Sequence, residues 1–141
     1  DSPKPAILLA GGTGFAPIKS IVENAIATGQ TRPMTLYWGS RDLAGLYQLD
    51  VARSWEARLP GFRCIPVLSD APAADTWSGR RGLAHAALMA DLPDLSGHEV
   101  YACGSPAMID AARADLTGRC QLPADAFFAD AFSFSTDPIP A

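Results

Sequence analysis

Apolar residues along the chain fall into short continuous runs and helically spaced sets. The runs predict buried strands, because a strand covered on both faces of a sheet has no polar side to present. Strands are expected at Ala6–Ala10, Met34–Trp38, Phe62–Leu68 and Glu99–Cys103, with a last short one at Ala126–Ala129.

Between these runs, apolar residues recur every three or four positions, which is the spacing of an amphipathic helix. Helices are expected from Pro17 to Gly29, from near Leu49 to Arg58, from Leu83 to Met89 and from Pro106 to about Leu116. The polar stretch from Ser69 to Gly82 is expected to form a loop. This alternation predicts a three-layer, Rossmann-like α/β domain with a five-stranded, mostly parallel sheet.

Composition narrows the classes of partner. The 141 residues suffice for one domain with a substantial core, and 48% of them are hydrophobic against 18% charged. The net charge of −4 argues against nucleic acid or an anionic membrane as partner. No apolar run is long enough to span a membrane and no secretion signal opens the chain, so a cytoplasmic protein is expected.

Cysteine and histidine spacing predicts no metal site. Cys64, Cys103 and Cys120 are odd in number and widely spaced, which fits neither a disulfide framework nor a metal or iron–sulfur centre. His85 and His98 lack ligand spacing and are expected to be ordinary residues. The chain opens at Asp1 without a methionine, which favours a piece of a longer protein over a processed complete one.

A glycine cluster separates the first strand from the first helix, in the pattern Gly12-x-Gly14-x-x-Pro17. Glycines let the backbone approach a ligand, and a helix N-terminus presents unpaired N–H groups with a partial positive charge. The turn is therefore expected to bind a pyrophosphate. Thr13 either donates a hydroxyl or caps the helix. Pro17 suits the first helical turn, where its missing N–H costs nothing.

The segment Cys103-Gly104-Ser105-Pro106 repeats this arrangement of strand, glycine and helix-starting proline. In parallel sheets, ligands bind at the carboxyl ends of the strands. The two turns would lie side by side if the strands ending at Ala10 and Cys103 are neighbours. A tight turn of small residues there would let a planar ring lie close, although a cysteine at a strand end is most often a core residue.

The end of the second strand carries both signs of charge, in Ser40-Arg41-Asp42. In dinucleotide folds this position meets the adenosine ribose. Arg41 suits the 2′-phosphate of NADPH and Asp42 would repel it, while a solvated loop explains either residue equally well. The residues by themselves leave the choice between NADH and NADPH open.

Taken together, these segments resemble the NAD(P)H-binding domain of the ferredoxin–NADP reductase family. The matching segments follow the family's order: Leu9–Pro17, Tyr37–Arg41, Trp77–Gly82, Tyr101–Pro106 and Phe128–Phe132. The likeness is closest to bacterial reductase components that feed ring-hydroxylating oxygenases or act in sugar deoxygenation. Residues 1–141 are then expected to form a single NAD(P)H-binding domain.

The resemblance implies that a nicotinamide passes hydride to FAD, and that electrons continue singly to an iron–sulfur centre or an acceptor protein. It implies a pyrophosphate site at the first glycine turn and a nicotinamide site at the second. The cofactor-binding residues would be Gly12, Thr13, Gly14, Pro17, Ser40, Arg41, Gly104, Ser105 and Pro106.

The catalytic residues implied by the resemblance are Cys103, Asp130 and Phe132. Cys103 would lie against the nicotinamide and Asp130 near the flavin edge. Phe132 would cover the flavin until the nicotinamide displaces it. Ser40 and Arg41 would set the nucleotide preference, and the oxygenase-type relatives favour NADH.

The resemblance also implies parts that the chain lacks. The family's FAD-binding barrel motif and its iron–sulfur cysteine spacing are absent, so FAD and any 2Fe–2S centre would belong to other domains. A ferredoxin or an oxygenase component would accept the electrons. One alternative is a non-catalytic, regulatory nucleotide-binding module of the same fold. Another is a stand-alone short dehydrogenase, but neither Lys4 nor Lys19 is placed for its acid–base chemistry.

Overall fold

The computed structural model describes residues 4–11, 15–29, 32–40, 49–69 and 80–131. Their strands are β1 (Ala6–Gly11), β2 (Met34–Ser40), β3 (Phe62–Leu68), β4 (Arg80–Arg81), β5 (Glu99–Gly104) and β6 (Phe127–Ala131). Their helices are α1 (Phe15–Thr28), α2 (Leu49–Arg58), α3 (Ala84–Asp91) and α4 (Pro106–Arg119). None of these helices is long and apolar enough to cross a membrane.

The strands form one sheet in the order β4-β3-β2-β1-β5-β6, and every pairing is parallel. The predicted α/β class and parallel sheet are confirmed, but the predicted number of five strands is wrong, because the described residues form six. The additional strand, β4, lies in the stretch expected to be a loop. Its two arginines show no apolar run, and only backbone pairing with β3 reveals it, including the Gly82 N–H to Leu68 carbonyl bond of 2.9 Å.

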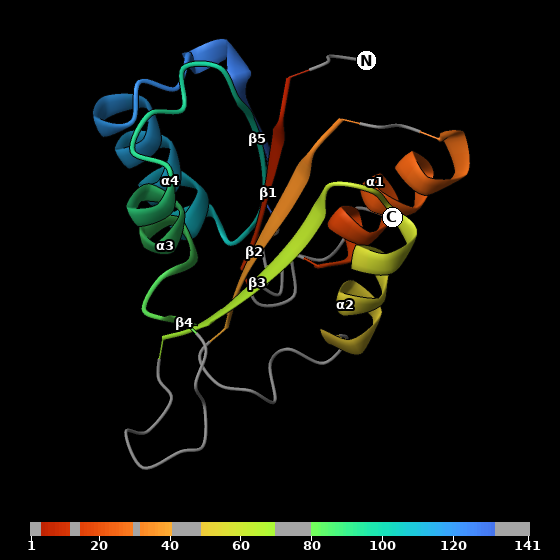
Figure 1. The fold of residues 1–141 in the computed structure, drawn as a ribbon. Coiled ribbons are helices and arrows are strands. Elements are labelled where there is room, and N and C mark those ends of the chain that lie inside the picture. Colours follow the sequence, from red (N-terminus) through yellow and green to blue (C-terminus); the bar gives the residue numbers. More distant parts are fainter. Residues whose placement is uncertain (1–3, 12–14, 30–31, 41–48, 70–79, 132–141) are drawn as a thin grey trace, which may run out of the picture.

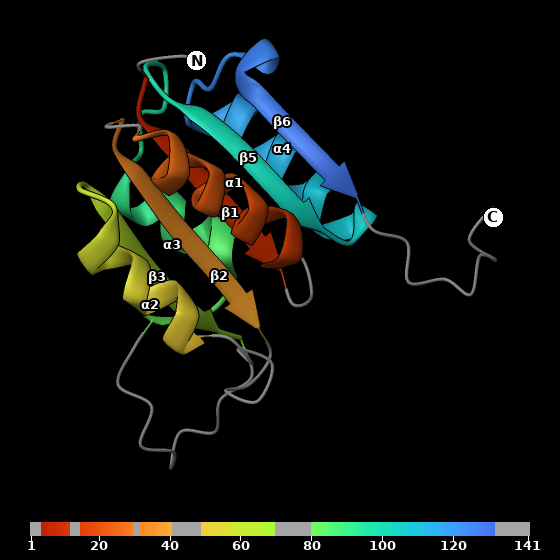
Figure 2. The ribbon, with the colours of Figure 1, turned by 90° about the vertical axis from the view of Figure 1, so that its right-hand side faces the viewer.

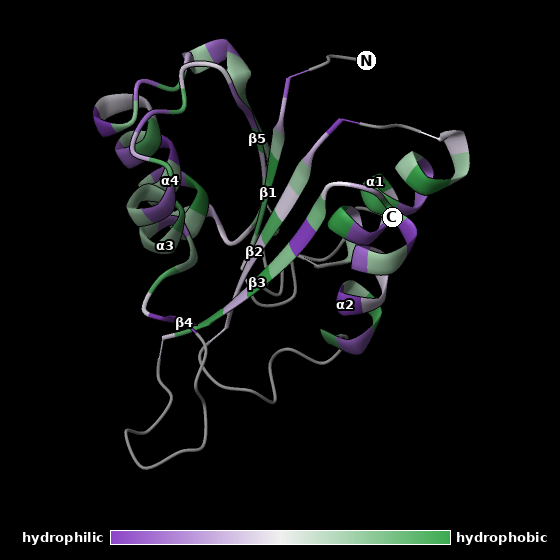
Figure 3. Ribbon diagram, in the orientation of Figure 1, coloured by the Kyte–Doolittle hydropathy of each residue, from purple (hydrophilic) through white to green (hydrophobic). Residues whose placement is uncertain are grey.

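Helices cover both faces of the sheet (Figure 1), with α1 and α2 on one face and α3 and α4 on the other. Side chains alternate along β1 and β2, so Leu8 and Leu36 join the core under α1 and α2, whereas Ile7 and Tyr37 join the core under α3 and α4. Figure 3 shows β1, at the centre of the sheet, as a hydrophobic strand. The continuous apolar run thus reflects burial on both faces.

The helical spacing of apolar residues expected between the strands is confirmed. In α1, Ile18, Val22 and Ala25 are buried, and Gly29 follows the helix at φ +71°, a conformation that glycine adopts without strain. Some boundaries move by two or three residues. Helix α4 runs past Leu116 to Arg119, and β6 begins at Phe127 because a 3₁₀ turn (Ala124–Ala126) occupies the residues before it.

Candidate functional site

The strands of two strand–turn–helix units end side by side, at the carboxyl ends of the strands of the sheet. Strand β1 leads to α1 and β5 leads to α4, and the two strands pair in parallel with Ala10 opposite Cys103. The strands that end at Ala10 and Cys103 are therefore neighbours, which is the condition under which the two glycine turns were expected to lie side by side. In this arrangement the carboxyl ends of both strands and the N-termini of both helices surround one place, where ligands of open parallel sheets bind.

Gly11 and Gly104 lie close to each other at the carboxyl ends of β1 and β5. A Cβ built on Gly104 would lie 3.6 Å from both the N and the Cα atoms of Gly11, and 2.9 Å from the Sδ atom of Met108. A Cβ on Gly11 would lie 3.4 Å from the Cγ atom of Met108. The space in front of both glycines is thus filled by the half-buried Met108 thioether, and only a Cβ on Gly104 would come closer to it than an ordinary contact.

Ser105 and Pro106 begin α4 as their types predict. The Ser105 Oγ accepts a hydrogen bond of 3.2 Å from the Met108 N–H, which satisfies one of the free donors of the first helical turn. Pro106 occupies the first helical position, where no backbone donor is lost. These two residues orient the helix, and with it Met108, relative to Gly104.

Pro17 lies in the first helical turn as expected, whereas Ser40, expected in the loop after a strand ending at Trp38, is the last residue of β2. Pro17 is in the first turn of α1 and half-buried. Ser40 ends β2, and its carbonyl accepts a 2.8 Å hydrogen bond from the Ser69 N–H, which ties the exits of β2 and β3 together. One residue earlier, Gly39 leaves room for α3, since a Cβ there would lie 2.9 Å from the Cβ of Ala84.

The Cys103 side chain lies in the core below the carboxyl ends of the strands and is not on the surface there. It is 3% exposed and belongs to the apolar core on the α1 side of the sheet, together with Ala10 and Ile18. No disulfide joins it to Cys64 or Cys120. The thiol is therefore placed to shape the floor of the site from below.

Several predicted site residues lie outside the described residues: Gly12, Thr13, Gly14, Arg41 and Phe132. Asp130 is described through its backbone, which pairs with Cys103 in the register of β5 and β6. The assignments of these residues stay predictions.

The aromatic run near the end of the chain divides between core and surface. Phe127 is buried, and the Arg113 guanidinium lies 4.9 Å from its ring centre. Phe128 is 42% exposed and stacks on Tyr101, with ring centres 4.9 Å apart and planes 22° apart. This division follows the alternation of side chains along β6.

A polar network that sequence analysis missed links β2, β4 and α3. The Asp91 Oδ2 accepts hydrogen bonds from the Tyr37 hydroxyl at 2.7 Å and from Arg80 Nη1 at 2.8 Å. The Arg80 hydrogen bond holds the pKa of Asp91 below its usual range, whereas burial raises the pKa of Tyr37. These residues are far apart in the sequence, so no local pattern signals them.

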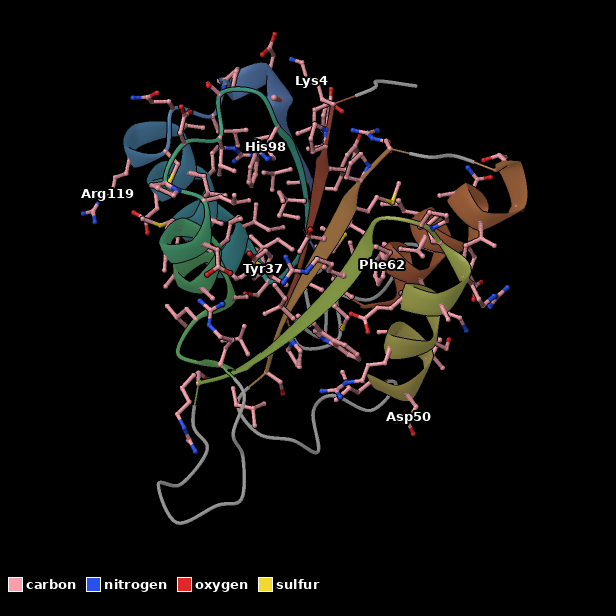
Figure 4. All side chains as sticks on the ribbon, in the orientation of Figure 1. Lys4, Tyr37, Asp50, Phe62, His98 and Arg119 are labelled. Carbon is pink, nitrogen blue, oxygen red and sulfur yellow. The ribbon has the colours of Figure 1, made fainter. Side chains whose placement is uncertain are left out.

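This network borders a groove of ≈ 600 Å³ on the α3 side of the sheet, lined also by Ile7, Arg63 and His98. Figure 4 shows Tyr37 between the sheet and α3, with His98 nearer the amino ends of the strands. The groove follows the amino halves of β1 to β3 and is therefore separate from the glycine turns. His85, in contrast, is buried against α4, with Nε2 2.9 Å from the Asp115 Oδ2.

Comparison with known proteins agrees with this geometry. Residues 8–114 match the family model described as the oxidoreductase NAD-binding domain. The chain is 44% identical over 128 residues to the CDP-6-deoxy-L-threo-D-glycero-4-hexulose-3-dehydrase reductase of Yersinia pestis, covering 91% of this chain and 38% of that protein. It is 37% identical to reductase component 2 of terephthalate 1,2-dioxygenase from a Comamonas species, covering 94% and 39%.

Among solved structures, the Amycolatopsis cytochrome P450 reductase GcoB superposes with a TM-score of 0.84 at 34% identity, over 94% of this chain and 38% of that one. The chain thus spans about two fifths of the length of these relatives. The resemblance to the nicotinamide-binding domain of ferredoxin reductase-type flavoproteins is confirmed. On its sequence, its fold and its paired glycine turns, the chain belongs to the oxidoreductase NAD-binding domain family.

Proposed function

We propose that the chain is the nicotinamide-binding half of a flavin-dependent NAD(P)H reductase. The observation that carries this proposal is the position of two glycines, Gly11 and Gly104, close to each other at the carboxyl ends of two adjacent parallel strands. Neither residue carries a Cβ, so the backbone there is open to a flat ring except where the Met108 thioether covers it. The reductases among its relatives support the same reading.

In this proposal the turn before α1 binds the pyrophosphate and the turn before α4 binds the nicotinamide. The N-terminus of α1 follows the first turn, and its partial positive charge favours the pyrophosphate at Gly12, Thr13 and Gly14. At the second turn, Gly104 would face the nicotinamide, with Cys103 packed below it. When bound, the nicotinamide supplies the hydride. The residues of this chain hold the ring in position for transfer.

The acceptor side of the reaction lies with FAD. In this proposal Asp130 lies near the flavin edge and Phe132 covers the flavin before the nucleotide binds. The position of Asp130 opposite Cys103 in the sheet supports the first assignment. Electrons would then pass to a ferredoxin or an oxygenase component, through a 2Fe–2S centre where the reductase carries one.

Nucleotide preference would be set at the end of β2, by Ser40 and Arg41. In this proposal the preferred nucleotide is NADH, as the resemblance to oxygenase reductase components implies. Calorimetric titration of the chain with NADH and NADPH tests binding. Rapid mixing of either nucleotide with the flavin-loaded reductase that contains this chain tests hydride transfer. Binding followed by bleaching of the flavin supports the proposal. Binding without bleaching supports a regulatory nucleotide-binding module, and the absence of binding contradicts both.

A further inference from the structure

The groove on the α3 side of the sheet has no part in the proposed function. It is lined by residues from the amino halves of β1, β2 and β3, whereas the glycine turns follow the carboxyl ends of the strands. Figure 2, which views the sheet from the α1 side, shows α3 behind it. Helix α3 ends at Asp91, and Asp91 and Leu92 are among the lining residues of the groove. All-parallel sheets are normally covered on both faces, so an open stretch beyond the end of this helix is a candidate binding site.

Strand register builds the floor of the groove. Thr35 pairs with Ile7 on one side and with Arg63 on the other, so these three side chains form one row across the sheet. Side chains two residues apart in a strand share a face, which places the pair of Tyr37 and Ile65 in the next row. Ile7 and Tyr37 belong to the core on the α3 side, and Ile65 packs against this core. The floor is therefore flat and mostly apolar, with Arg63 at its β3 end.

The described lining residues carry more positive than negative charge. Arg63 and Arg80 are the two arginines among them, and Asp91 is the one carboxylate. Arg80 is bound to the end of α3, because its Nη1 lies 2.8 Å from the Asp91 Oδ2 and its Nη2 donates a 3.3 Å hydrogen bond to the Ala87 carbonyl. Arg63 is exposed and forms no hydrogen bond or ion pair with the rest of the described chain. The groove therefore holds one positive charge that no carboxylate of its own matches.

His98 supplies a second unmatched polar group. It precedes β5 and lines the groove, nearer the amino ends of the strands than Tyr37 (Figure 4). Its Nδ1 atom is buried and has no hydrogen-bond partner in the part of the chain that the structure describes. A buried ring nitrogen without a partner is unusual in native proteins, and a place for a bound molecule is one explanation. Unmatched polar groups thus stand at the two ends of an apolar floor.

We propose that this groove binds a small organic carboxylate with a flat apolar body, such as an aromatic acid. A guanidinium matches a carboxylate both in charge and in its two-point hydrogen-bonding geometry. A single unmatched charge favours a monoanion over a phosphate group, which carries close to two negative charges. The groove of ≈ 600 Å³ has the size of a small-molecule site, and its apolar floor suits the body of the ligand. Because the groove is separate from the glycine turns, this inference does not rest on the proposed function.

Benzoate binding to the assembled, flavin-loaded reductase tests the site. Amide NMR spectra of the labelled protein are expected to show saturable shifts at Ile7, Thr35 and His98, with a dissociation constant on the order of 1 mM. Benzamide has the same shape without the charge and is expected to bind at least about tenfold more weakly. Equal binding of benzamide, or shifts centred on Gly104, overturns the inference. An absence of saturable shifts also overturns it, and this is the result expected if another part of the reductase covers the groove.

Arg63→Gln removes the unmatched charge and is expected to weaken benzoate binding by about tenfold or more. Arg58→Gln is the matched control, since Arg58 is exposed at the end of α2, on the opposite face of the sheet. It is expected to leave benzoate binding unchanged. Both arginines are exposed, so neither substitution is expected to unfold the chain. Unchanged affinity in Arg63→Gln, or an equal loss in Arg58→Gln, overturns the inference.

Discussion

Replacing Gly104 by alanine adds a single methyl group between the two glycine turns. The added Cβ would lie 3.6 Å from the N and Cα atoms of Gly11, which is an ordinary contact. It would lie only 2.9 Å from the Sδ atom of Met108, about 0.5 Å inside the ordinary range, so the thioether or the turn must move. The substitution therefore perturbs the seat of the proposed nicotinamide with little other change.

The expected cost in folding free energy is small. Overpacking costs about 1–3 kcal/mol, and the low end applies because the clash falls on the flexible end of a methionine. Gly104 is not among the glycines with positive φ, so alanine fits its backbone conformation. Alanine also restricts the unfolded chain, which stabilises the folded state by about 0.4–1 kcal/mol. The net destabilisation is therefore about 1 kcal/mol or less. Hydride transfer is more sensitive, since a misplacement of about 1 Å can lower its rate 10²-fold. We expect flavin reduction to be about tenfold slower, which on the free-energy scale is about half of that effect.

Urea denaturation and rapid mixing measure the two effects separately. Gly118→Ala is the control, because a Cβ on this α4 glycine meets nothing within 4 Å. It is expected to raise the stability by up to about 1 kcal/mol and to leave flavin reduction unchanged. A double-mutant cycle of Gly104→Ala with Met108→Ala should show a coupling of about 1 kcal/mol. Wild-type rates in Gly104→Ala, or a coupling of zero, would refute the reasoning.

Other substitutions test single assignments. Gly14→Val is expected to abolish nucleotide binding without unfolding the chain, and unchanged binding in calorimetry would contradict the pyrophosphate assignment. Arg41→Ala should weaken NADPH more than NADH, whereas equal losses would mean that Arg41 does not contact the 2′-phosphate. Cys103→Ala should slow flavin reduction in the assembled reductase more than it weakens binding, and a change in affinity alone would limit Cys103 to packing. Arg80 lowers the pKa of Asp91 in the folded state. The ionised Asp91 therefore stabilises the fold at a pH above its unfolded pKa near 3.8, and this stabilisation is lost as the pH falls through its folded pKa. Denaturation of the wild type and of Asp91→Asn across this pH range should show that the difference in their free energies of unfolding shrinks toward acid pH. A constant difference would contradict the linkage.

The layers of the fold follow from local sequence. Continuous apolar runs identified the central strands, and glycine followed by proline identified the start of α4 and, two residues late, that of α1. Local sequence left open whether the strands ending at Ala10 and Cys103 are neighbours, and the observed strand order, in which β1 pairs with β5, answers this question.

Features made by distant residues escaped prediction. Strand β4 consists of two arginines and exists through its pairing with β3, so no periodicity marks it. The contact of Met108 with Gly11 and Gly104 depends on the direction in which Ser105 caps α4. The Tyr37–Asp91–Arg80 network joins three elements across the sheet, and only the folded chain brings them together.

The most direct test of the central claim is rapid mixing of the assembled, flavin-loaded reductase with NADH or NADPH under anaerobic conditions. The yellow flavin is expected to bleach in a single transfer phase with wild-type chain, and to stay oxidised when the chain carries Gly14→Val. A flavin that neither nucleotide bleaches, or that bleaches equally well with the Gly14→Val chain, would contradict the assignment of this chain as the nicotinamide-binding half.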